Sequence, residues 1–513
     1  MTARRVKPPF SWLGPFTDSL VLASALLLAI FMRFYDLAQL PPGFDASLAT
    51  SAIQAQALLQ HGTIPGLDSS NGYAPLWVWL QAIGIKIAGA SPLSLRLLPA
   101  ALGALAVIPM WFVTRQWLGR TAAHAATFTL ASLPWAVTAS RLGTVAAAVP
   151  LMLTLTVWLA GRAWRQPQPI RAGLLAVVAL VNLAIGPMGW LINALVLGLA
   201  FVRIIHRHKR PTTTPSVVTG VVFSGLVMAT IIVMVANSWD SLSQLFNWSG
   251  FSYKPASWLA ALSANFLMLI GPGSGDANYV HNLPNQPALN SFLAISFATG
   301  LLVAITRIKL YTYRWLLAWL FIGLLPAVFT APGTANFSRS VVALPAVVML
   351  AGLGIHYILN LWYSTFPANS AARSVGQATV IVLIILSTAL GYTQYFRAWG
   401  HTGATYAAHN EGPVRLGTNL HTSKSDGPVY VVTTPAEQPI IQYLADSRPA
   451  TYIKIDELAV LPTAGEAKYF YISASERDAS KKLLKAKFPG GTFKPHFSPF
   501  NQTEVYYTYE MTK

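Results

Sequence analysis

The acidic residues of this chain point to chemistry at one face of a membrane. Residues 1–393 contain no glutamate and six aspartates, which are Asp18, Asp36, Asp45, Asp68, Asp240 and Asp276. A carboxylate in hydrocarbon costs several kcal/mol unless it is paired or hydrated. All except Asp18 fall in segments that we expect on one side of the membrane, so a reaction or binding site is expected at that face. Asp45, directly before a predicted helix over 46–60, is the first candidate for a catalytic carboxylate.

The composition is that of an integral membrane protein. Of the 513 residues, 54% are hydrophobic and 10% are charged, whereas soluble domains carry about 25% charged residues. Apolar stretches of roughly 17–22 residues recur in the first 393 positions, and each is long enough to cross about 30 Å of hydrocarbon. The chain has no cysteine, which excludes disulfides, thiolate metal sites and cysteine nucleophiles.

The basic residues set the expected orientation in the cytoplasmic (inner) membrane. Residues 1–393 hold 22 Lys and Arg against 6 Asp, a net charge of +16, and 16 of the 22 lie between predicted spans on one side. The positive-inside rule makes that side, and the N-terminus, cytoplasmic. Because the positive charge is spread over short loops, nucleic-acid binding is not expected. No small-residue cleavage site follows the first apolar run, so we predict an uncleaved first span.

We predict a polytopic all-α membrane domain over residues 1–393 with eleven transmembrane helices. The predicted spans are 16–34, 97–114, 121–138, 144–161, 172–187, 188–204, 214–236, 289–306, 315–331, 340–362 and 375–393. The apolar segment 75–89 is short, carries Lys86, and would reverse every later loop if it spanned. We therefore predict an amphipathic helix there, lying at the outer interface.

The external parts of the chain are two loops and a C-terminal domain. The loops cover 35–96 and 237–288, and the second contains a predicted interfacial helix at 255–270. Residues 394–513 carry 13 Lys and Arg against 11 acidic residues. Strand-like and helix-like patterns alternate along them, which predicts a small external α/β domain. Its predicted strands are 428–433, 450–455, 468–473 and 504–510, and its predicted helices are 436–445 and 476–487.

Several motifs follow one another in an order that is typical of a known enzyme class. They are Pro41-Pro42-Gly43-Phe44-Asp45, Asn71-Gly72-Tyr73-Ala74-Pro75-Leu76-Trp77, Arg96 after Ser91-Pro92-Leu93, Ser140-Arg141-Leu142-Gly143, Gly275-Asp276, His281-Asn282-Leu283-Pro284 and Phe337-Ser338-Arg339. In order and topology the chain resembles the GT-C membrane glycosyltransferases, a group that includes protein O-mannosyltransferases and lipid A aminoarabinose transferases. The resemblance covers about residues 30–350.

The resemblance implies a reaction at the external face. A sugar would pass from a polyprenyl-phosphate donor to a glycan, lipid or protein acceptor, building or decorating a surface glycan. Asp45 would be the catalytic base or a metal-binding group. The implied phosphate-binding groups are Arg96, Arg141 and Arg339, and further candidates for substrate binding are Asp68, Tyr73, Asp276 and His281. No cofactor is certain, and the requirement for a divalent cation stays open because only some members of the superfamily use one.

The chemistry of such a transfer needs these residue types. Arginine offers paired donors to the phosphate oxygens that become charged as the sugar leaves, and a carboxylate within hydrogen-bond reach can take the proton of the acceptor. We therefore expect Asp45, Arg141 and Arg339 to face one cavity that is open to lipid and to the exterior.

The chain departs from the family pattern at two positions. The family usually has an acidic doublet where this chain has Asp45-Ala46, and often a glutamate where it has Ala74. Three interpretations stay open: Asp45 acts alone, Asp68 or Asp276 assists it, or the protein is catalytically altered.

Each candidate also has a structural interpretation. Asp45 could cap the helix over 46–60, and Arg96 and Arg141 could anchor the ends of spans. Asp276 could be a turn residue, and His281 could form hydrogen bonds within its loop.

Two other functions also stay open. One is a non-catalytic glycan-binding or scaffold protein, which the missing carboxylates would favour. The other is a transporter of lipid or sugar, for which the sequence shows no clear internal repeat.

Overall fold

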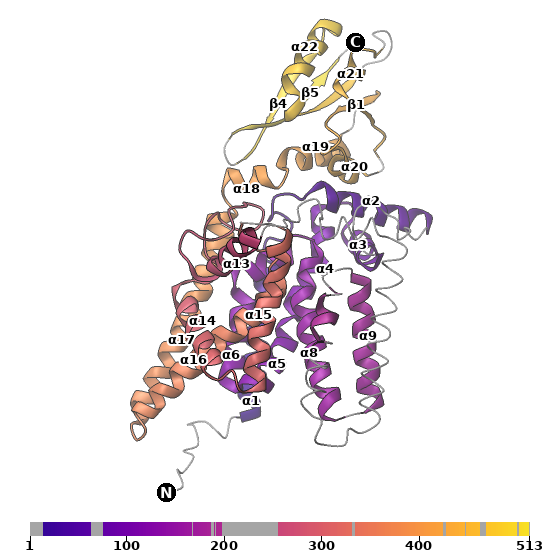
Figure 1. Cartoon of the computed structure of the whole chain (residues 1–513). Helices are drawn as coiled ribbons and strands as arrows, with labels where there is room; N and C mark the ends of the chain where they lie inside the picture. Colours follow the sequence, from indigo (N-terminus) through magenta and orange to yellow (C-terminus); the bar gives the residue numbers. More distant parts are fainter. Residues whose placement is uncertain are drawn as a thin grey trace.

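The computed structural model describes residues 14–62, 75–166, 168–185, 189, 191–196, 198, 255–330, 334–423, 427–446, 448–461, 468–499 and 502–511. Most helices form an upright bundle, and a small sheet domain stands on one end of it (Figure 1). We call the two ends of the bundle the sheet-domain end and the base.

The bundle contains long helices and a few short ones. The α-helices are α1 (Gly14–Phe34), α2 (Ala46–His61), α3 (Pro75–Ala88), α4 (Pro92–Leu105), α5 (Val107–Leu118), α6 (Arg120–Ser132), α7 (Pro134–Arg141), α8 (Val149–Arg165), α9 (Pro169–Ile185), α13 (Pro255–Ile270), α14 (Ser291–Thr306), α15 (Tyr311–Thr330), α16 (Leu344–Thr365) and α17 (Ser370–Tyr392). Two short 3₁₀ turns are η2 (Val145–Ala147) and η4 (Val341–Ala343), and a π-helix, η5 (Thr393–Trp399), follows α17.

Six stretches of the described residues are long and apolar enough to cross a membrane. They are Phe16–Phe34, Pro92–Leu118, Val145–Arg165, Tyr311–Phe329, Val341–Thr365 and Ser370–Trp399. Each overlaps a predicted span, and the chain has the character of a multi-pass membrane protein. The predicted spans 172–187 and 289–306 correspond to the shorter apolar helices α9 and α14.

Three of the eleven predicted spans have a different outcome. The span predicted at 121–138 is divided between α6 and α7 at Leu133, because Pro134 has no N–H to donate and is tolerated in the first turn of a new helix. The spans predicted at 188–204 and 214–236 lie mostly or wholly outside the described residues.

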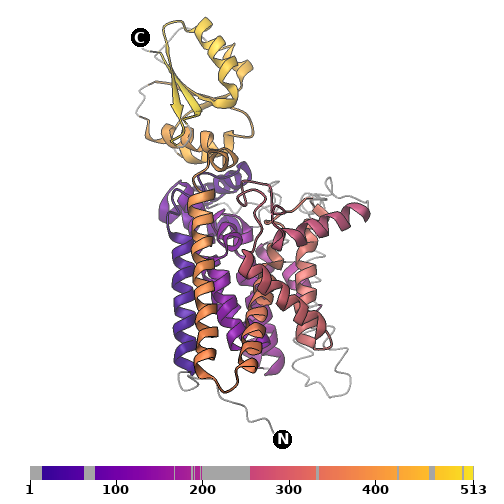
Figure 2. The same cartoon turned by 90° about the vertical axis from the view of Figure 1, so that its left-hand side faces the viewer.

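The core of the bundle is built on close contacts of α16. A Cβ atom at Gly354 would lie 1.8 Å from the carbonyl oxygen of Ser296 on α14, and one at Gly300 would lie 1.9 Å from that of Leu350. Small residues of this kind let membrane helices approach closely. Figure 2 shows α1 and α17 running side by side at another face of the bundle, where the rings of Phe31 and Tyr392 stack 6.1 Å apart.

Two helices lie across the sheet-domain end of the bundle. Figure 1 shows α2 running across that end and α3 beneath it, seen nearly end-on, while α4, α8 and α9 stand upright. The helices predicted at 46–60, 75–89 and 255–270 correspond to α2, α3 and α13.

The sheet domain contains a five-stranded mixed sheet. Its elements are α18 (Gly403–Ala408), α19 (Glu411–Thr422), β1 (Val429–Val432), α20 (Gln438–Ala445), β2 (Thr451–Ile453), α21 (Ile455–Leu458), β3 (Tyr469–Ser473), η6 (Ala474–Glu476), α22 (Arg477–Lys487), β4 (Thr492–Phe497) and β5 (Glu504–Glu510). The strand order is β2-β1-β3-β5-β4, with β1 parallel to β2 and β3 and with β5 antiparallel to β3 and β4.

The sequence predicted four of these strands and missed β4. That strand is at the edge of the sheet and contains Pro495. Proline cannot donate to a neighbouring strand and is tolerated only at such edges, so the local pattern did not indicate a strand. The helices α18, α19 and α21 were not predicted either.

The sheet domain packs against α2 and the start of α4. The hydroxyl of Tyr443 lies 2.7 Å from that of Ser94, and the amide of Gln56 donates to a carboxylate oxygen of Asp446 at 3.1 Å. The ring of Tyr443 also meets that of Phe44 edge-on, with centroids 5.9 Å apart. The domain is therefore in direct contact with the segment that precedes Asp45.

Candidate functional site

Asp45 is the N-cap residue of α2. Its Oδ1 accepts a hydrogen bond from the backbone N–H of Leu48 at 2.7 Å and one from the hydroxyl of Ser47 at 2.7 Å. Its backbone is extended, as is usual at an N-cap. The side chain is exposed, and no cation among the described residues forms an ion pair with it. The structural interpretation of Asp45 is confirmed, and Oδ2 stays available to a substrate because no described residue bonds it.

Residues 35–44, which we call the strap, connect α1 to α2 and are held by Arg141. This side chain lies at the end of α7 and is completely buried. Its two terminal nitrogens donate, at 2.8–3.1 Å, to the carbonyl oxygens of Met32, Tyr35, Asp36 and Leu40. The last carbonyls of a helix have no partner within it, and Arg141 supplies partners for those at the end of α1.

Arg96 binds two further carbonyl oxygens of the strap. It is 1% exposed, and it donates to the carbonyl oxygen of Leu37 at 3.1 Å and to that of Gly43 at 3.0 Å. The guanidinium groups of Arg96 and Arg141 therefore bind backbone oxygens inside the protein. These contacts do not support the predicted phosphate-binding role or the predicted cavity shared by Asp45 and Arg141. What the structure shows instead is that both arginines fix the segment leading to Asp45.

Asp276 and His281, two other predicted site residues, form a pair. Asp276 is 3% exposed; its Oδ2 lies 2.8 Å from Nδ1 of His281 and accepts the N–H of Phe337 at 3.0 Å, while its Oδ1 accepts the N–H of Asn278 at 2.9 Å. A carboxylate acceptor requires a proton on Nδ1, so Nε2 of the neutral ring is an acceptor. No described residue bonds Nε2. Asp276 is thus both a turn residue and the group that orients His281.

Arg339 lies in the turn that Asp276 holds. This turn includes Phe337, and the backbone N–H of Arg339 donates to Oδ1 of Asn336 at 2.9 Å. The side chain is half-buried, and burial lowers the pKa of Arg339 below its ordinary value. Of the three predicted phosphate-binding arginines, Arg339 is the one whose turn is bonded to Asp276, through the backbone N–H of Phe337.

The π-helix η5 connects the strap to the loop that carries His281. Trp399 of η5 donates through its indole N–H to the carbonyl oxygen of Tyr279 at 2.8 Å. Rings of η5 also pack in one apolar cluster with Leu40 of the strap and with Leu283. The two segments that carry the candidate residues are therefore joined through a common set of contacts at the sheet-domain end.

The sequence missed the contribution of the sheet domain to the site. Asn410 adopts a left-handed backbone (φ 57°), and its amide donates to the carbonyl oxygen of Phe44 at 3.0 Å. A Cβ atom at Gly43 would lie 2.0 Å from the carbonyl oxygen of His409. Only glycine permits such a close backbone approach, so Gly43 in the Pro41–Asp45 motif was the available signal.

The remaining candidates are not resolved by these contacts. Asp68 and Tyr73 lie outside the described residues. Within the described part of the chain, no group of three or more His, Cys, Asp or Glu side chains could hold a metal ion.

Comparisons with known proteins identify the fold. Residues 72–239 match the family model described as dolichyl-phosphate-mannose-protein mannosyltransferase. The crystal structure of ArnT from Cupriavidus metallidurans bound to undecaprenyl phosphate is similar at a TM-score of 0.58 and 13% identity, over 97% of this chain and 98% of that one. The chain has the GT-C fold. The resemblance predicted from the motifs is thereby confirmed.

Two further structures with this fold are similar. ArnT in the apo state has a TM-score of 0.54 at 13% identity, over 96% of this chain and 98% of that one. The Archaeoglobus fulgidus oligosaccharyltransferase tethered with an acceptor peptide has a TM-score of 0.52 at 15% identity, over 97% of this chain and 74% of that one. No curated protein matches the sequence.

Proposed function

We propose that this GT-C protein is a membrane glycosyltransferase that moves a sugar from a polyprenyl-phosphate donor to an acceptor, with Asp45 as the base. The observation that carries the proposal is the position of Asp45 on a fixed segment with one carboxylate oxygen open. ArnT was crystallised with undecaprenyl phosphate, which supports a lipid-linked donor. The oligosaccharyltransferase was crystallised with a tethered acceptor peptide, which supports transfer to an acceptor. Asp45 and the Asp276–His281 pair would then face the exterior of the cytoplasmic membrane, together with the sheet domain.

The proposed reaction exchanges one bond of the sugar. The acceptor gives its proton to Oδ2 of Asp45 and forms a bond to the anomeric carbon, while the bond from that carbon to the phosphate oxygen breaks. The polyprenyl phosphate leaves with the negative charge. A carboxylate base of this kind is typically worth 10²–10⁴-fold in rate.

Arg339 and the Asp276–His281 pair are the proposed partners of Asp45. Arg339 would donate to the leaving phosphate, because guanidinium groups pair well with phosphate oxygens. His281, oriented by Asp276, would bind the substrate through Nε2. This arrangement would supply the assistance that a single carboxylate needs where the family usually has an acidic doublet. Asp68 and Tyr73 stay candidates for substrate contacts.

A second function is a glycan-binding protein without catalysis. Two observations favour it: Asp45 already serves as a helix cap, and Arg96 and Arg141 are used inside the protein.

The experiment that separates the two functions uses the purified full chain with a panel of polyprenyl-phosphate hexoses. Release of polyprenyl phosphate with transfer of the sugar is expected for the wild type. Asp45→Asn should reduce the rate by about 10²–10⁴-fold, whereas Asp456→Asn, at an exposed position of α21, should not. Full turnover by Asp45→Asn would refute the role of this residue as base. Binding of a donor by the wild type without turnover would favour the second function.

A further inference from the structure

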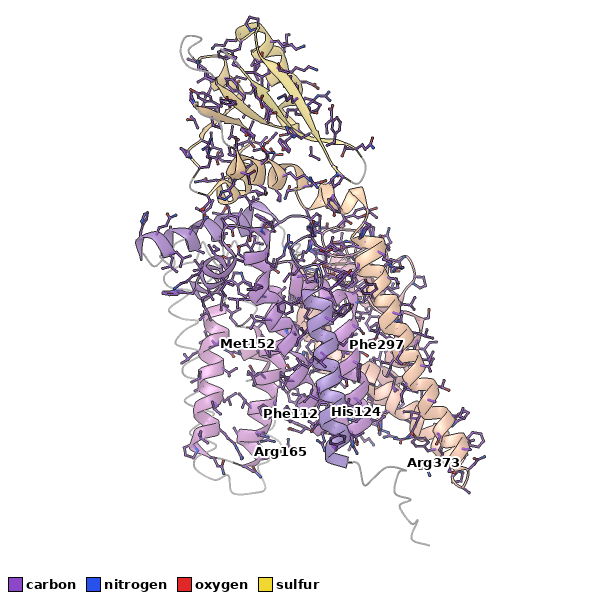
Figure 3. All side chains as sticks on the ribbon, turned by 180° about the vertical axis from the view of Figure 1, so that it is seen from behind. Phe112, His124, Met152, Arg165, Phe297 and Arg373 are labelled. Atoms are coloured by element: carbon purple, nitrogen blue, oxygen red, sulfur yellow. The ribbon has the colours of Figure 1, made fainter. Side chains whose placement is uncertain are left out.

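A cationic cavity lies at the base of the bundle, away from the site proposed above. It has a volume of about 570 Å³ and lies between the ends of α5 and α8. Its charged lining consists of Arg115, Arg162 and Arg165, and the described residues that line it include no acidic side chain. Figure 3 labels Phe112 and Arg165 in the lower part of the bundle, far from the sheet domain.

The arginines of this cavity are combined with flat aromatic rings. The guanidinium of Arg162 lies over the ring of Trp158 at 5.0 Å, and Phe112 stacks on the same ring at 5.1 Å. Tryptophan and arginine together are typical of the headgroup level of a membrane. The cavity can therefore accept an anionic group beside apolar surface.

A second cavity adjoins the first and is richer in apolar side chains. Its volume is about 220 Å³, it shares Gln116 and Arg165 with the first cavity, and its lining includes Trp117, Trp164 and Trp315. A ligand that occupies both needs a negative charge at one end and an apolar portion at the other. This combination fits a lipid better than a free phosphate.

The arginines at the end of α8 have a simpler interpretation, but it does not explain the position of Arg115. Arg162 and Arg165 are in the last turn of α8, where positive side chains interact favourably with the helix dipole. That effect does not require Arg115 of α5 to line the same cavity. Arg115 also pairs with Asp18 of α1 at 2.9 Å, so an ion pair helps to fix its position.

We propose that this pair of cavities binds an anionic glycerophospholipid. The phosphodiester would accept hydrogen bonds from the arginines of the larger cavity, and the start of an acyl chain would lie among the tryptophans of the smaller one. Basic pockets between transmembrane helices recognise anionic headgroups in this way. The site is separate from the proposed reaction and does not depend on it.

The test is native mass spectrometry of the full chain with phosphatidylglycerol or phosphatidylcholine of the same acyl length. The wild type should retain phosphatidylglycerol preferentially. The double variant Arg162→Gln/Arg165→Gln should lose that preference, by about fivefold for each arginine removed. The matched control is Arg373→Gln, because its guanidinium also lies over a ring, that of Tyr363 at 5.1 Å, at another part of the base (Figure 3). It should behave as the wild type.

Several results would overturn the proposal. They are equal retention of the two lipids by the wild type, or an unchanged preference in a double variant that melts like the wild type. If the double variant does not fold, the proposal is tested on the wild type by competitors that could displace bound phosphatidylglycerol. Displacement of phosphatidylglycerol by glycerol 3-phosphate at equal concentration would indicate a site for a free phosphate instead. Displacement by undecaprenyl phosphate at equal concentration would indicate a donor-lipid site. Resistance to both competitors would support the proposal.

Discussion

The side-chain amide of Asn410 donates to the carbonyl oxygen of Phe44 at 3.0 Å, so a residue of the sheet domain holds the residue directly before Asp45. The contact joins positions 366 residues apart in the chain. It lies beside the close approach of Gly43 to His409. The sheet domain is therefore part of the support of the candidate carboxylate.

Removing the amide of Asn410 should loosen the strap. We expect Asn410→Gly to lower the free energy of unfolding by about 1 kcal/mol and to reduce turnover, because glycine keeps the left-handed backbone but loses the hydrogen bond. The measurement is thermal unfolding together with the transfer assay. The control is Asn419→Ala in α19, because the side chain of Asn419 has no hydrogen bond to a described residue. Glycine is not used there, because it would itself destabilise the interior of a helix. Equal turnover of Asn410→Gly and the wild type would show that this contact of the sheet domain does not support the candidate site.

The two roles of Asp45 can be separated by choice of substitution. Asparagine caps a helix about as well as aspartate, whereas loss of the cap to alanine costs about 1 kcal/mol. Asp45→Asn should therefore keep the thermal stability of the wild type, and Asp45→Ala should lower it. Both should lose transfer if the carboxylate is the base. A variant Asp45→Asn that is as unstable as Asp45→Ala would mean that the charge itself stabilises α2.

Arg141 should be far more sensitive to substitution than Arg339. Lysine has one nitrogen and cannot reach the four carbonyls that the two terminal nitrogens of Arg141 bind. We expect Arg141→Lys to lower the free energy of unfolding by more than about 3 kcal/mol, since buried charged hydrogen bonds are lost. Arg339→Lys should lose less stability than Arg141→Lys, because Arg339 is only half-buried, and should show its effect in transfer. Size-exclusion profiles and melting curves of the two variants make the comparison, and a stable Arg141→Lys would contradict the structural role.

Local sequence was sufficient to predict the helix at the candidate site. Asp45 is an N-cap residue, and Gly62 ends α2 with a left-handed backbone at φ 65° and an N–H bonded to the carbonyl of Leu58. Both signals lie within one helix and act over a few residues.

The partners of the buried arginines could not be predicted in the same way. Arg96 and Arg141 bind backbone oxygens that are 53 to 109 positions away in the chain. Every residue has a backbone carbonyl oxygen, so the sequence does not indicate which of them needs a side-chain partner. The phosphate-binding role predicted for the same arginines therefore rests on the family pattern alone.

His409 predicts how stability depends on pH. It is 3% exposed, and burial lowers its pKa to about 4, with the nearby positive charge of Arg96 acting in the same direction. In the unfolded chain the ordinary value is about 6.5. Between about pH 6.5 and pH 4 the unfolded state binds a proton that the folded state does not, so the free energy of unfolding falls as the pH falls.

The loss from this one residue should reach about 3 kcal/mol at the acid end of that window. His409→Gln, which stays uncharged, should therefore lose less stability than the wild type between pH 7.5 and pH 4.5 in thermal unfolding. His61→Gln, at the exposed end of α2, should follow the wild type. Carboxylates titrate in the wild type and in both variants. The contribution of His409 is therefore the difference between the stability–pH curves of His409→Gln and the wild type. Parallel curves for His409→Gln and the wild type would show that His409 takes up a proton in the folded state as readily as in the unfolded one.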